Sequence, residues 1–119
     1  MHYRQTVFEC RKFVPDEDEV ISMAKFSVGQ LCLTNGVNDL ACESPQFAEF
    51  LCRSMSRYIA CDWGELCEDD KMSNDEAVAS GDDRIFAAYK YDDEHPDWKI
   101  WIITEWDRSV TTILFPREY

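Results

Sequence analysis

Hydrophobic positions in the last third of the chain fall into three short runs, at residues 84–91, 98–105 and 109–115. The runs are rich in β-branched and aromatic residues, and short polar connections separate them, which predicts three strands in an antiparallel meander. The middle run contains Trp101 and Ile102, which alternate faces and are both apolar. We therefore expect this strand to lie at the centre of the sheet.

Two stretches in the middle of the chain predict helices. Over 45–60, Ser44 can cap the helix start and a proline occupies the first helical position, before apolar residues recur at helical spacing. Over 68–80, three acidic residues fill the first turn and Gly81 provides a stop signal. This second helix has few apolar residues, so we expect much of it to face solvent.

The first third of the chain is less regular. Alternation over 26–33 predicts a strand, and the polar segment after it predicts a short helical turn that reaches Ala41. Residues 1–14 predict an optional strand, followed by a short helix or a solvated loop at the acidic run 16–19. At 119 residues the chain has room for one domain. We expect an N-terminal extension at 1–25 and a single α+β domain at 26–119, with an antiparallel β-meander sheet that carries two or three helices on one side.

The charge balance limits the partners. The chain has 24 Asp and Glu against 12 Lys and Arg, which gives a net charge of -12. Such a field repels nucleic acids and anionic membrane surfaces, so we expect neither to bind directly, and basic proteins become the compatible partners. The N-terminus shows no signal peptide, and the longest apolar run, 100–103, is far too short to span a membrane. We expect a cytoplasmic protein with six reduced cysteines, because no Cys-x-x-Cys pair is present.

Catalytic and metal-binding motifs are absent from the sequence. The only histidines are His2 and His95, and no phosphate loop, nucleophile elbow or metal-ligand spacing occurs. The acidic pairs 82–83 and 92–93 could hold a hard cation, but neither has the spacing of a calcium loop. We therefore expect no enzyme activity, cofactor or metal, while a small enzyme that uses a thiol or carboxylates stays an open alternative.

Acidic residues concentrate between residues 62 and 97, where 13 carboxylates stand against three basic side chains. One interpretation is a solvated face that keeps the protein soluble. The other is a surface that imitates the phosphate backbone of DNA, which carries one charge per about 1.7 Å of duplex. The residues predicted to bind a partner are Glu65, Glu68, Asp69, Asp70, Asp75, Glu76, Asp82, Asp83, Asp92 and Asp93, together with Trp106.

Several segments resemble a family of small "plasmid-related" proteins of bacterial plasmids, integrative elements and phages, over about 26–119. They are Asp62-Trp63-Gly64-Glu65-Leu66-Cys67-Glu68-Asp69-Asp70, Asn74, Arg84-Ile85, Tyr89, Ile100-Trp101-Ile102-Ile103-Thr104-Glu105, Asp107-Arg108-Ser109, Thr111-Thr112-Ile113-Leu114, Pro116 and Tyr119. The chain departs from that family at Tyr58, Cys61 and Trp106, where relatives tend to have His, Gly and a small residue. The resemblance implies a mobile-element context in a bacterial host cell.

Small acidic proteins of mobile elements include anti-CRISPR and anti-restriction proteins, many of which imitate DNA, and this step is an analogy. The analogy agrees with the concentration of acidic residues between residues 62 and 97. The leading hypothesis is a non-enzymatic, anti-CRISPR-like inhibitor that binds a CRISPR effector, or another host nuclease, and blocks its nucleic-acid-binding surface. The alternative is a plasmid or phage accessory or regulatory module that binds another protein through the sheet, with Trp98 or Trp106 as a contact. A homodimer through an edge strand is compatible with either hypothesis.

Overall fold

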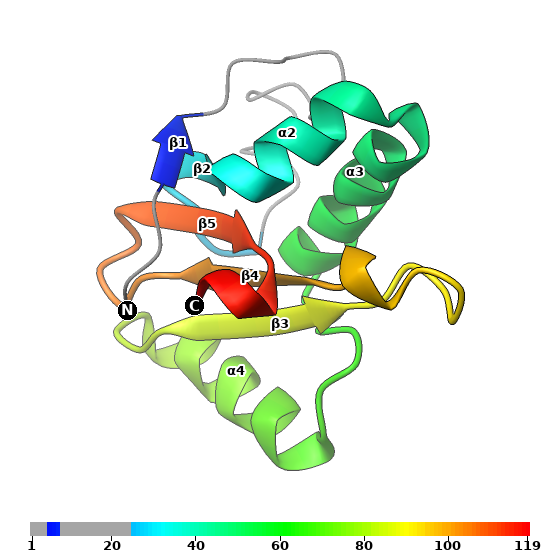
Figure 1. Ribbon diagram of the computed structural model, residues 1–119. Coiled ribbons are helices and arrows are strands. Elements are labelled where there is room, and N and C mark those ends of the chain that lie inside the picture. The colour runs from blue at the N-terminus through cyan, green and yellow to red at the C-terminus, as the bar shows by residue number, and fades with distance from the viewer. Residues whose placement is uncertain (1–4, 8–24) are drawn as a thin grey trace.

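The computed structural model describes residues 5–7 and 25–119, and these form a mixed sheet with three α-helices (Figure 1). The strands are β1 (Gln5–Val7), β2 (Gln30–Thr34), β3 (Ile85–Tyr89), β4 (Ile100–Thr104) and β5 (Val110–Leu114). The helices are α2 (Asn35–Glu43), α3 (Pro45–Ile59) and α4 (Glu68–Ser80), with the short 3₁₀ turns η2 (Pro96–Trp98) and η3 (Pro116–Glu118). The predicted α+β class is confirmed. The predicted boundary between an extension at 1–25 and a domain at 26–119 stays a prediction, and the acidic run 16–19 lies outside the described residues.

The sheet has the strand order β1-β2-β5-β4-β3. β3, β4 and β5 form the predicted antiparallel meander, but β2 pairs in parallel with β5 and in antiparallel with β1. The predicted strand over 26–33 begins late, at Gln30, because Gly29 has a φ of 62° and turns the chain. A side chain at Gly29 would overlap the backbone carbonyl oxygens of Arg108 and Ser109.

The main core lies between α3 and one face of the sheet. Ser44 Oγ accepts a hydrogen bond of 3.2 Å from Phe47 N, so the predicted cap of α3 is confirmed. Tyr58, fully buried on α3, shares a 2.7 Å hydrogen bond with Thr104 Oγ1 of β4. Thr104 in turn shares a 2.6 Å bond with Thr111 Oγ1, whose hydroxyl donates to the carbonyl of Val28. This chain of hydroxyls satisfies polar groups that would otherwise be buried without partners.

α4 lies along the outer edge of β3 and not on a face of the sheet (Figure 1). Only Asn74 and Ala77 of this helix are buried. Asn74 holds the helix in place: its Nδ2 donates to Phe86 O at 2.6 Å and its Oδ1 accepts from Phe86 N at 3.2 Å. The small apolar surface of α4 is sufficient for this edge position, because the side-chain amide of Asn74 bonds to the edge of β3 where a neighbouring strand would otherwise pair.

The segment before α4 occupies the rest of the same edge. Gly64 forms an isolated parallel bridge with Ala88, and Glu65 N donates to Ala88 O at 2.8 Å. The outer backbone groups of β3 are therefore paired within the chain at Phe86 and Ala88. Two copies could join through β3 only after α4 moved away, whereas β1 is the other edge strand of the sheet, and the homodimer stays a prediction.

The end of α3 contains a strained residue. Asp62 N donates to Arg57 O and Cys61 N to Tyr58 O, the hydrogen-bond pattern of a Schellman motif. Cys61 occupies the left-handed position of this motif, with a φ of 65°. Glycine is the usual residue at that position. The resemblance pointed to this same position as one where a glycine is common.

Replacing Cys61 with glycine is expected to stabilise the protein by about 0.5 kcal/mol. Relief of the left-handed backbone, worth about 1–2 kcal/mol, exceeds the packing lost with a half-buried thiol and the added entropy of the unfolded chain. Urea unfolding measures the difference. Cys61→Ala is the matched control, since it removes the thiol and keeps the strain, and it should be less stable than the wild type. A loss of stability in Cys61→Gly equal to that in Cys61→Ala would contradict the strain argument.

Candidate functional site

The predicted acidic residues of α4 are all exposed, and they continue on both sides of the helix. We call the following set the acidic edge: Glu65, Glu68, Asp69, Asp70, Asp75, Glu76, Asp82 and Asp83. α4 has 13 residues and spans about 20 Å at 1.5 Å per residue. The helix follows the outer edge of β3 (Figure 1), so these acids belong to α4 and to the loops on either side of it at this edge of the sheet. The structure thus brings together eight of the predicted partner-binding acids.

Arg108 connects the turn between β4 and β5 to the end of α4. Its Nη2 donates to Ala77 O at 2.8 Å, and its Nη1 donates to the carbonyls of Asp83 and Trp106. A cation at the C-terminus of a helix is favourable because the last carbonyls carry partial negative charge. One side chain therefore places the Trp106 turn beside the C-terminal end of the acidic edge.

Two large apolar side chains are exposed in this region. Trp106 is 63% exposed and Met72 is 59% exposed. Met72 lies one turn from both Glu68 and Glu76 on the outward side of α4, so acids flank it. By contrast, Trp63 is buried and donates from Nε1 to Asp75 Oδ1 at 3.0 Å, which holds α4 to the core and leaves no exposed ring to contact a partner.

Asp92 and Asp93 are the predicted contacts that the structure does not join to the acidic edge. They follow the C-terminal end of β3, and Asp93 forms an ion pair with Lys90. Asp92 Oδ1 accepts from His95 N at 2.8 Å and lies 2.8 Å from His95 Nδ1. Their carboxylates have partners within this loop, so they contribute less to an extended negative surface than the acids of α4.

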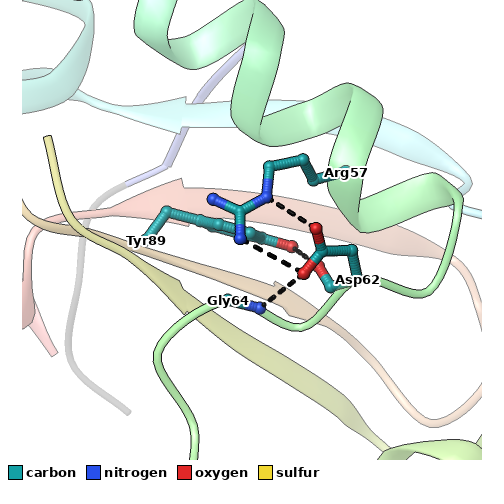
Figure 2. Close-up of polar contacts among 4 residues, drawn as sticks. All are labelled: Arg57, Asp62, Gly64 and Tyr89. Carbon is teal, nitrogen blue, oxygen red and sulfur yellow. Dashed lines mark hydrogen bonds and ion pairs between the residues drawn. The ribbon is translucent and has the colours of Figure 1, made fainter.

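The start of the acidic edge is fixed by Asp62 (Figure 2). Arg57 Nε and Nη2 donate to its carboxylate at 2.8 and 3.2 Å, and Gly64 N donates to it at 3.2 Å. The guanidinium lies 5.1 Å from the centre of the Tyr89 ring, and Tyr89 OH donates to Asp62 O at 2.6 Å. The Arg57 hydrogen bond lowers the pKa of Asp62. The stability that the ionised Asp62 carboxylate contributes is therefore present above the pKa that Asp62 has in the unfolded chain. It is lost as pH falls through the lowered pKa of Asp62 in the folded protein.

Metal ligands and activated nucleophiles do not gather in the described part of the chain. No group of three or more His, Cys, Asp or Glu side chains there could hold a metal ion. Cys32, Cys61 and Cys67 are free thiols. Burial raises the pKa of Cys32, Cys52 and Cys61, which disfavours the nucleophilic thiolate. Among the described residues, no helix is both long and apolar enough to cross a membrane.

Comparison of the chain with protein-family models, curated proteins and solved structures finds no match. The resemblance to the plasmid-related family therefore stays a prediction, and the function has to be argued from the site itself.

Three residues of the site were missed in the sequence. Asn74 and Arg108 entered only through the resemblance, although they position the acidic edge and the Trp106 turn. A lone amide in a helix with almost no apolar face was a usable signal for Asn74. Nothing local identified Arg108, because its acceptors lie on α4 and on the loop after it. Met72 is one of the few apolar residues of the helix, and it is exposed to solvent and not part of the core.

Proposed function

We propose that the protein is a non-enzymatic inhibitor that binds a basic nucleic-acid-binding protein, of the class of CRISPR effectors or other host nucleases, and blocks its nucleic-acid-binding surface. The observation that carries this proposal is the acidic edge: exposed carboxylates along about 20 Å of helix and its flanking loops. Of its acids only Glu68 forms an ion pair within the described residues, at 3.7 Å to Lys71.

The geometry of the acidic edge supports imitation of a phosphate backbone. A basic groove that binds DNA presents Lys and Arg at intervals set by the phosphates, and a rigid helix can offer carboxylates along such a groove. Complementary charge speeds association and makes it sensitive to salt. Trp106 and Met72 add apolar contact area at the acidic edge, which charge alone does not supply.

A second candidate function rests on Trp106 alone. An exposed tryptophan in a turn is typical of an anchor for protein–protein contact, and it favours an accessory or regulatory module that binds through this end of the sheet. That function predicts that Trp106→Ala abolishes partner binding and that charge reversals along α4 leave it unchanged.

The test begins with the tagged protein and a panel of CRISPR effectors and restriction enzymes, with a salt gradient for elution and DNA-cleavage assays on each enzyme that binds. The informative variant is Glu76→Lys/Asp82→Lys/Asp83→Lys. These residues lie toward and beyond the C-terminus of α4, where added cations favour the helix dipole, so the fold is expected to persist. Reversal of Glu68, Asp69 and Asp70 would instead weaken the start of the helix.

We expect the triple variant to need at least about tenfold more protein for half-maximal inhibition, from three lost charge contacts of about 0.5 kcal/mol each. The matched control is Asp39→Lys/Glu43→Lys/Glu49→Lys, which makes the same change in net charge on α2 and α3. The control should inhibit like the wild type. Equal loss in both variants would show that only net charge matters, and unchanged inhibition in the first would contradict the acidic-edge proposal.

A further inference from the structure

A surface hollow lies between α3 and the chain that follows β3. It has a volume of about 580 Å³, and its walls include Phe50, Cys52, Arg53, Arg57, Lys90 and Tyr91. Pockets that hold small ligands have volumes of about 300–1,000 Å³. The hollow is separate from the exposed side of α4, because its walls come from α3 and from residues 90–91.

Every charged side chain that lines this hollow is basic: Arg53, Arg57 and Lys90. In a chain with 12 basic residues and a net charge of -12, convergence of three cations is unexpected from composition. Arg53 and Arg57 are four residues apart on one face of α3, and like charges at this spacing destabilise a helix. An anion in the hollow would remove that repulsion.

The three cations keep donors for a ligand. Arg57 uses Nε and Nη2 for Asp62, which leaves Nη1. Lys90 pairs with Asp93, and both side chains remain exposed, at 49% and 89%. Arg53 makes no ion pair or hydrogen bond within the described residues. Asp62 and Asp93, the carboxylates that pair with Arg57 and Lys90, do not line the hollow themselves.

One wall of the hollow is aromatic. The Tyr91 ring packs edge-on against Phe50, with ring centres 5.4 Å apart, and against Trp98, with centres 4.7 Å apart. These contacts hold Tyr91 half-buried in a fixed orientation beside the cations. A rigid aromatic side chain next to several phosphate-binding groups can receive the planar ring of a ligand whose phosphates meet the cations.

We propose that this hollow binds a small phosphate-bearing ligand of the nucleoside-phosphate class, with Arg53, Arg57 and Lys90 on the phosphates and Tyr91 beside the base. A nucleic-acid polymer is disfavoured because it would extend over the acidic surface of the chain. A small ligand interacts mainly with charges within a Debye length of about 8–10 Å. The proposal does not depend on the inhibitor function.

The test is isothermal titration calorimetry of the full chain at low ionic strength with ATP, pyrophosphate and adenosine as separate probes. We expect saturable binding of ATP and pyrophosphate and none of adenosine. Tighter binding of ATP than of pyrophosphate is expected from the contact of Tyr91 with the base, and equal affinities would overturn that contact. Absence of binding by both phosphates, adenosine binding as tight as that of ATP, or tighter binding of a single-stranded oligonucleotide would overturn the proposal.

Two variants locate the binding. Arg53→Gln and Lys90→Gln should each weaken ATP binding about fivefold to tenfold, the loss of one charge-assisted hydrogen bond. Neither side chain is buried, so both variants are expected to keep the circular dichroism and urea midpoint of the wild type. Arg117→Gln is the matched control, since Arg117 is exposed, equally charged and outside the hollow. Binding that survives both Arg53→Gln and Lys90→Gln in one chain would place the ligand elsewhere.

Discussion

Replacement of Gly64 by alanine should destabilise the protein by more than about 3 kcal/mol. Gly64 has a φ of 73°, and an added Cβ would overlap the carbonyl oxygen of Ala88 and come within 2.8 Å of the Tyr89 ring. Alanine therefore combines a left-handed backbone, which costs about 1–2 kcal/mol, with a clash against β3 that costs at least as much. Neither neighbour can retreat easily, because Ala88 is in a strand and the Tyr89 hydroxyl bonds to Asp62 O. Urea unfolding monitored by tryptophan fluorescence measures the loss.

Gly81 is the matched control for this prediction. Its φ is 77°, almost the same as that of Gly64, but an added Cβ meets nothing within 4 Å. Gly81→Ala should therefore cost only the backbone strain, about 1 kcal/mol. If both alanine variants lost the same stability, the close approach of Gly64 to β3 would not be the cause.

The second large effect is expected at Asn74. Asn74→Ala removes both hydrogen bonds to Phe86 and leaves its backbone N–H and C=O without partners under α4. Each buried group left unpaired costs about 1–3 kcal/mol, so we expect a loss of about 3 kcal/mol or a detached helix. Hydrogen exchange distinguishes the two outcomes, since detachment gives rapid exchange at the backbone amides of α4 while β4 and β5 stay protected. Ser73→Ala, at an exposed position of the same helix, is expected to change neither quantity appreciably.

The variant Asn74→Asp should lose stability to an extent that depends on pH. The carboxylate can still accept from Phe86 N but faces the carbonyl oxygen of Phe86, which raises its pKa. The variant's deficit in stability should shrink as pH falls through that raised value, because the protonated acid can donate as the amide does. A deficit that is constant between pH 4 and about 8 would show that the hydrogen bond to Phe86 O contributes little.

The local parts of the fold were predictable from local signals. Ser44 and the proline after it mark the start of α3, and Gly81 marks the end of α4, so both helices begin and end within a residue of the prediction. The three strands of the meander were identified because each is a short apolar run between polar turns. The predicted spans were longer by one or two residues at each end, where alternation continues but pairing stops.

Long-range arrangement was harder to predict because it depends on contacts that the sequence does not place. The parallel pairing of β2 with β5 joins residues that are about 80 apart in the chain. The position of α4 depends on a single amide that bonds to a strand edge, which hydrophobic periodicity does not detect. The acidic residues of the candidate site were identified from composition alone. Their separation into the acidic edge and the loop in which Asp92 and Asp93 have partners required the positions of Lys90 and His95.

The shallow attachment of α4 has a consequence for how the protein can vary. Only Asn74 and Ala77 of this helix are buried, Val78 packs partly against the core and Asp75 bonds to Trp63, so most of the other positions of the helix face solvent. Substitutions there can change the spacing and sign of the surface charges while the sheet and α3 fold as before. Folding thus depends mainly on the sheet and α3, and a new target could be met by changes within one helix.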